Sequence, residues 1–130
     1  MKVLVCMIFF FALIGGCANI QTVKDAKGKE GISRIYQYPY DNVFSAALAA
    51  AKSKELDIVE ADKQNGQIIL SHGVTMLSWG ERIAIFIKSL SPNTTEVQIV
   101  SKPILSPGNF PPDWQQILLL NMDINLRSGK

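Results

Sequence analysis

Few side chains in the sequence have the type and spacing that acid–base or metal chemistry requires. His72 is the only histidine, and no second ligand type stands beside it at the spacing of a structural zinc site. Asp57, Glu60 and Asp62 form a short acidic cluster. Glycosidase-type catalysis needs two carboxylates at a set separation, whereas a short amphipathic strand ending in a polar turn ordinarily carries such charges. We therefore expect a hydrogen-bonded or edge histidine, solvated carboxylates, no catalytic residue and no metal.

Both cysteines lie near the start of the chain. Cys6 lies inside the apolar run Val3–Ile14, which follows the single cation Lys2, and Cys17 comes after two glycines. A charged residue, an apolar stretch and then small residues are the order of a secretory signal. As a helix, Val3–Gly16 would reach about 21 Å, which is shorter than a hydrocarbon core of about 30 Å. The pattern therefore favours a signal over a spanning helix.

The four residues Ile14-Gly15-Gly16-Cys17 resemble the lipobox of bacterial lipoproteins. The resemblance implies cleavage between Gly16 and Cys17 and a diacylglyceryl thioether on Cys17, usually with an acylated amine. Two or more acyl chains bind a bilayer stably, whereas one binds marginally. In this family Ala18 after the cysteine fits sorting to the outer membrane, with the domain on the inner leaflet facing the periplasm. The alternatives are an uncleaved signal anchor and an ordinary secretory signal with a chance cysteine.

Removal of residues 1–16 would leave a protein without a second thiol, which excludes a disulfide and a thiol catalyst. Lys2 is one of 13 basic residues, so 12 would remain against 11 acidic ones. So balanced a charge gives no support for a nucleic-acid partner. Residues 17–31 are polar and lack a clear period, which predicts a flexible tether with a root-mean-square span of about 20 Å. No cofactor is expected beyond the covalent lipid.

From residue 32 the sequence has the periods of strands and helices and predicts a single domain over 32–130. A helix is expected from Asp41, as its N-cap, to Lys54, and another over 112–127. Asn65-Gly66 predicts a tight hairpin turn with positive φ angles, and Ser91-Pro92-Asn93 predicts a second turn. Alternating apolar residues predict strands over 32–38, 56–62, 67–74, 82–88 and 95–102. The expected fold is α+β: an antiparallel sheet of about five strands with one or two helices on one face, in the order β-α-β-β-β-β-α.

Two features favour a binding surface. Trp79 lies with Met76 in a connection between strands, where it either forms a binding tip or caps the edge of the core. The last expected helix has two apolar sectors, more apolar surface than one neighbouring layer needs. It is either wedged between the sheet and the first helix or docks a partner or a second copy. The candidate partner surface consists of Trp79, Leu118, Met122 and Leu126; the other apolar sector consists of Ile117, Leu120 and Ile124.

The stretches "YDNVFSAALAAAK", "ELDIVEADKQNGQIILS", "SWGERIAIFI" and "TEVQIVS" resemble the BamC-like helix-grip domains of envelope lipoproteins. The resemblance implies a scaffold role in an envelope complex. We therefore expect a lipid-anchored, noncatalytic domain that binds an envelope protein. The alternative is a periplasmic carrier, because a helix-grip sheet and its helices can enclose a cavity for a lipid or another apolar ligand.

Overall fold

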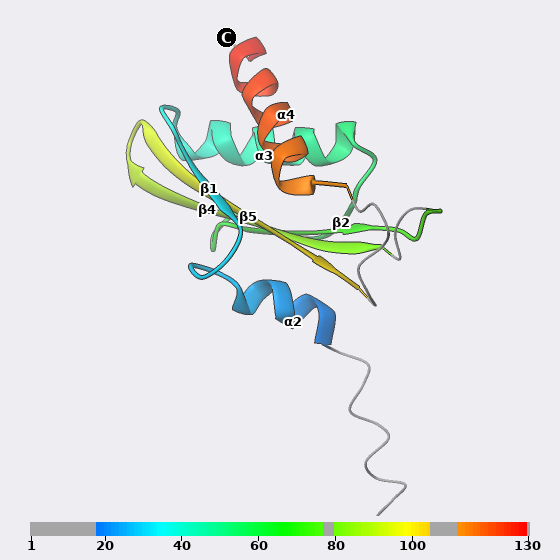
Figure 1. Cartoon of the computed structure of the whole chain (residues 1–130). Helices are drawn as coiled ribbons and strands as arrows, with labels where there is room; N and C mark the ends of the chain where they lie inside the picture. Colours follow the sequence, from blue (N-terminus) through cyan, green and yellow to red (C-terminus); the bar gives the residue numbers. More distant parts are fainter. Residues whose placement is uncertain (1–17, 77–79, 105–111, 130) are drawn as a thin grey trace, which may run out of the picture.

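The computed structural model describes residues 18–76, 80–104 and 112–129. Its centre is one antiparallel sheet of five strands in the order β1-β5-β4-β3-β2 (Figure 1). The α+β class, the antiparallel sheet and the β-α-β-β-β-β-α order from β1 onward are confirmed. The strands are β1 (Ile32–Tyr36), β2 (Asp57–Asp62), β3 (Gln67–His72), β4 (Glu81–Ser91) and β5 (Thr94–Pro103).

Two helices, α3 (Tyr40–Ser53) and α4 (Trp114–Ser128), lie on one face of the sheet. Alanines on the inner side of α3 allow it to approach the sheet closely, and they are strong helix formers. The helix begins at Tyr40 with Pro39 as its N-cap. The expectation that Asp41 caps it is wrong, since Asp41 lies within the first turn, where a carboxylate still interacts favourably with the helix dipole.

The main core lies between this face of the sheet and the two helices. The alternation expected of the strands is confirmed, because every second residue of the central strands is buried there. From the sheet the core receives Ile68, Leu70, Ile83, Ile85, Ile87, Val97 and Ile99, and from the helices Val43, Phe44, Ala47, Leu118, Leu119 and Met122.

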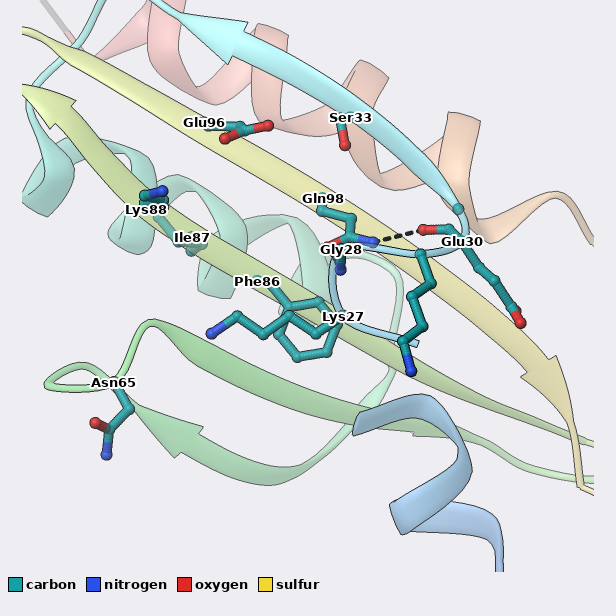
Figure 2. Close-up of a pocket in the computed structure, with 12 residues that line it drawn as sticks. Lys27, Gly28, Glu30, Ser33, Asn65, Phe86, Ile87, Lys88, Glu96 and Gln98 are labelled. Atoms are coloured by element: carbon teal, nitrogen blue, oxygen red, sulfur yellow. Dashed lines mark hydrogen bonds between the residues drawn. The ribbon is translucent and has the colours of Figure 1, made fainter. Parts of the chain in front are cut away.

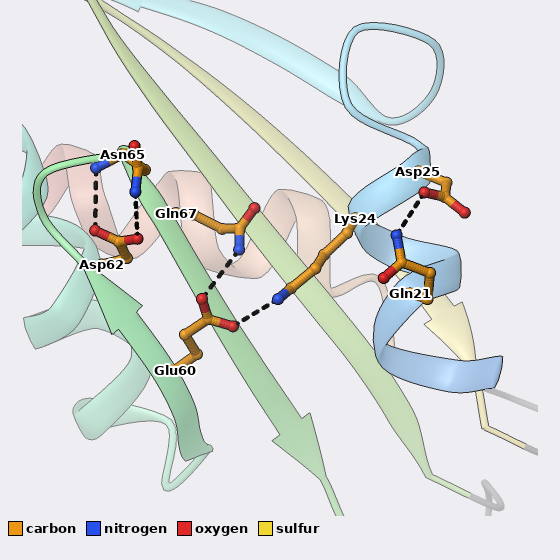
Figure 3. A network of polar contacts seen from close by, with 7 residues as sticks. All are labelled: Gln21, Lys24, Asp25, Glu60, Asp62, Asn65 and Gln67. Carbon is orange, nitrogen blue, oxygen red and sulfur yellow. Dashed lines mark hydrogen bonds and ion pairs between the residues drawn. The ribbon is translucent and has the colours of Figure 1, made fainter. Parts of the chain in front are cut away.

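The β2–β3 connection contains four residues, Lys63 to Gly66, between the strands where they were expected. The expected positive φ angles are found in part, because, of Asn65 and Gly66, only Gly66 has a positive φ, of 65°. The Asp62 carboxylate accepts hydrogen bonds from the Asn65 backbone N–H at 3.0 Å and from the Asn65 side chain at 2.7 Å (Figure 3). These hydrogen bonds lower the pKa of Asp62. The aspartate thus stabilises this four-residue loop.

The opposite face of the sheet carries helix α2 (Ala18–Asp25). The prediction of a flexible tether over 17–31 is wrong for this segment, because Val23 is fully buried and Ala26 is 3 % exposed. Both pack in a second cluster together with the partly buried Ile20. Ile20 and Val23 are three residues apart, which places them near one side of the helix, and Ala26 directly follows its end. From the sheet this cluster receives Ile69, Ala84, Phe86 and Val100.

Candidate interaction surface

Helix α4 is capped at its start and is held by polar contacts to two neighbouring elements. At its start, the Asp113 carboxylate accepts a hydrogen bond from the Gln116 backbone N–H at 3.2 Å, which makes Asp113 its N-cap. On the side of β1, Asp123 forms an ion pair with Arg34 at 2.6 Å. On the side of α3, the Asn125 amide donates to the Ala46 carbonyl at 3.5 Å. The rotation of α4 about its axis is therefore set by its neighbours.

The inner side of α4 contains three of the four residues expected to form a partner surface. Leu118 and Met122 are fully buried, and Leu126 is 6 % exposed. All three belong to the main core, where they face the sheet and α3. The prediction that they contact a partner is therefore wrong. Trp79, the fourth residue, lies outside the described residues; Met76, near it in sequence, is completely exposed.

The outer side of α4 carries the other apolar sector. Leu120 is 61 % exposed and Ile124 is 56 % exposed, and at four residues apart they are neighbours on one side of the helix. Ile117, one turn earlier, is partly buried and packs against the core. We call Leu120 and Ile124 the outer stripe. The expectation that α4 has more apolar surface than one neighbouring layer needs is thus confirmed, and the exposed sector is the one opposite to Leu118, Met122 and Leu126.

Next to the start of α4, the buried carboxylate of Glu81 joins two aromatic side chains. Its Oε2 lies 2.7 Å from His72 Nδ1 and accepts a hydrogen bond from Trp114 Nε1 at 3.2 Å. The imidazole and indole rings also contact, with centroids 4.7 Å apart. His72 is hydrogen-bonded, as the sequence predicts. These contacts join the first residue of α4 to β3 and β4, which gives the cluster a structural role.

The acidic residues of β2 separate into different environments. Glu60 accepts from the Gln67 side chain at 3.2 Å and forms an ion pair with Lys24 of α2 at 2.9 Å, whereas Asp62 stabilises the hairpin (Figure 3). Asp57 is exposed. Within residues 18–76, 80–104 and 112–129, no three histidine, cysteine, aspartate or glutamate residues are grouped so as to hold a metal ion.

A hollow of about 660 Å³ lies beside α2, on the face of the sheet opposite the main core. Figure 2 shows its lining, with Lys27 over the Phe86 ring at 5.7 Å from the centroid and Lys88 further along β4. Glu96 and Gln98 of β5 also line it, so basic, acidic and amide groups are mixed. Sequence reasoning missed this hollow because the 26–31 loop forms one wall only once α2 is packed on the sheet.

The cleavage and lipidation residues Gly16 and Cys17 lie outside the described residues, and lipidation stays a prediction. In the part of the chain that the structure describes, no helix is both long enough and apolar enough to span a membrane.

Comparisons with known proteins give the fold alone. No family model and no curated protein matches the sequence. Among solved structures, the adenylate sensor from AMP-activated protein kinase, in complex with the ribofuranotide ZMP, is similar with a TM-score of 0.50 and 15 % identity over 72 % of this chain and 94 % of that one. Ara h 8.0201 has a TM-score of 0.39 and 10 % identity, over 75 % and 95 % of the two chains. The first likeness indicates that this arrangement of sheet and helices also occurs in a sensor domain.

Proposed function

We propose that this chain is a bacterial envelope lipoprotein whose noncatalytic domain binds another envelope protein through the outer stripe of α4. In this proposal the signal is cleaved after Gly16, Cys17 carries the lipid, and the domain lies at the inner leaflet of the outer membrane. The proposal is carried by one observation: Leu120 and Ile124 stay more than half exposed on a helix that its neighbours otherwise hold in place.

The outer stripe is small, and a lipid anchor makes a small surface sufficient. Full burial of a leucine or isoleucine side chain is worth about 1.5–3 kcal/mol. Both residues are somewhat more than half exposed, so covering them contributes roughly 2–3 kcal/mol in total by the same measure. Attachment to one membrane raises the effective concentration of the partner, so a weak interface of this kind is occupied.

The described residues favour protein binding over the carrier alternative. An apolar ligand would need apolar space between the sheet and the helices α3 and α4. Most side chains there pack on one another, and the hollow of about 300 Å³ at the start of α4 has Glu81 and Asp113 in its lining. Val43, Ile83 and Leu118 are all fully buried in the same cluster. The hollow of about 660 Å³ lies on the other face, where Lys27, Lys88 and Glu96 line it beside Phe86, so a lipid tail placed there would contact charged groups that lose water.

The test is co-purification of partners from cells that express Leu120→Asp or Ile124→Asp in the full-length chain. Leu90→Asp is the matched control, because Leu90 is 46 % exposed and lies in β4, away from α4. Since all three side chains are exposed, the variants are expected to fold, which circular dichroism and thermal unfolding check.

We expect a defined envelope protein to be lost with the two α4 variants and retained with Leu90→Asp. Retention of the same partners by all three variants would refute the outer stripe as the binding surface. Palmitate labelling of wild type and Cys17→Ser tests the anchor separately. A Cys17→Ser chain that still takes up palmitate, or a wild-type chain that takes up none, would refute it.

A further inference from the structure

Ala18, the residue directly after Cys17, already belongs to helix α2 (Ala18–Asp25). We propose that α2 acts as a rigid connector: it holds the α2-bearing face of the sheet against the bilayer and directs the outer stripe of α4 away from it. This inference rests on the proposed lipidation of Cys17, and it replaces the flexible tether that the sequence alone predicts.

The first argument is that α2 is fixed to the sheet. Val23 is fully buried against the second cluster, and Lys24 forms its ion pair with Glu60 of β2 at 2.9 Å (Figure 3). The helix therefore contacts the central strands through an apolar side and an outer strand through a charge. Two such points of contact hold both its position and its direction on the sheet.

The second argument is that the loop after α2 is also tied down. The Gln98 side chain of β5 accepts from the Gly28 backbone N–H at 2.9 Å and donates to the carbonyls of Ala26 and Glu30. Gly31 has a φ of 85°, and a Cβ there would lie 2.1 Å from the Ile99 carbonyl oxygen. The backbone thus lies directly on β5 where it enters β1, which leaves the 26–31 loop little freedom.

The third argument is the short span of chain between Cys17 and the part of α2 that packs on the sheet. Ile20, a residue of α2 that packs in the second cluster, is three residues from Cys17. Three extended residues span at most about 11 Å, compared with about 20 Å for the flexible tether of 14 residues. A lipid on Cys17 therefore holds the α2 side of the domain within about one nanometre of the lipid headgroups. The outer stripe lies beyond the sheet and α4, each roughly 10 Å thick.

The charged residues on the α2 side indicate whether attraction to anionic lipids or the covalent lipid sets the orientation of the domain on the membrane. Lys27, Lys29 and Lys88 are exposed there, but Glu96 lies directly opposite Lys88 on the neighbouring strand β5, and Glu30 pairs with Lys102. So mixed a surface gives little net attraction to anionic lipids. The covalent connection therefore sets the orientation, which should not depend on salt. The hollow beside α2 opens on this membrane-facing side (Figure 2).

The test uses the full-length lipidated protein, reconstituted into vesicles of phosphatidylethanolamine and phosphatidylglycerol. If Cys6 is removed with the signal and Cys17 is acylated, a single introduced cysteine can be labelled with a fluorophore that reports contact with lipid. Lys29→Cys reports the α2 side, and Ile124→Cys reports the outer stripe. A matched control inserts about twelve Gly and Ser residues after Ala18, which restores a flexible span of about 20 Å.

We expect quenching by lipid-borne quenchers at position 29 to exceed that at position 124 several-fold, at low and at high salt, and the insertion to remove most of the difference. Equal quenching at the two positions in lipidated protein would overturn the orientation and leave the anchor intact. Protein without palmitate would overturn the anchor, and the orientation with it. A difference that disappears at high salt would assign the orientation to charge and also overturn the proposal.

Discussion

Val23 is the side chain that attaches α2 most completely to the sheet, and Val23→Ala is expected to loosen this helix. The substitution removes two methyl groups from a fully buried site. At about 0.8 kcal/mol for each group, with a further contribution from the cavity left behind, the cost is about 2 kcal/mol. The undocked state of α2 should then become about 30-fold more populated.

Hydrogen exchange measures this change directly. The backbone N–H groups of α2 and of Gly28, which donates to Gln98, should lose protection about 30-fold, while those of β4 and β5 change less because the sheet has its own core. Gln21→Ala is the control, since Gln21 is exposed and contacts Asp25 of the same helix. The reasoning is refuted if Val23→Ala leaves α2 protected, or if α2 lacks protection in the wild type.

Three further substitutions test how the domain is held together. Glu81→Ala should lower the free energy of unfolding, measured in urea, by about 2–3 kcal/mol because it leaves the Trp114 N–H without this acceptor. Glu81→Gln keeps an acceptor oxygen and should lower it less, and equal losses for the two variants would contradict this. Gly66→Ala should destabilise by more than about 1 kcal/mol, because φ is 65° and a Cβ would lie 2.0 Å from the Ile87 carbonyl oxygen; unchanged thermal unfolding would contradict it. Burial raises the pKa of Tyr36 above its ordinary 10.0, so its contribution to stability is complete below pH 10 and is lost as pH rises toward the folded-state pKa. Tyr36→Phe should reduce the slope with which the free energy of unfolding falls as pH rises above 10. A smaller slope should remain from Tyr40, whose pKa is also raised, and a slope equal to that of the wild type would count against this reasoning.

The sheet and both helices of the main core could be predicted because their residues repeat with one period over many positions. Ile83, Ile85 and Ile87 alternate along β4 and all face the core. The last helix is marked at its start by Asp113, which is its N-cap. In these elements local preference and tertiary packing favour the same structure.

The remaining features depend on contacts that no local pattern reveals. Helix α2 has a short apolar side, Ile20 and Val23, which is weak by itself and is stabilised by Phe86 and other apolar residues on the second face of the sheet. The two sectors of α4 are similarly apolar, so the sequence does not show which of them faces the core. The ion pair between Arg34 and Asp123, which are 89 positions apart in the chain, helps to fix the side of α4 that faces inward.

Site-specific photocrosslinking in intact cells tests the central claim most directly. A crosslinking amino acid replaces Ile124 in the outer stripe of the full-length chain, and in separate strains it replaces Leu90, exposed in β4. The account predicts that position 124 gives a discrete adduct with one envelope protein, that position 90 does not, and that Cys17→Ser weakens the adduct by releasing the domain from the membrane. The same adducts at both positions, or none at position 124, would contradict it.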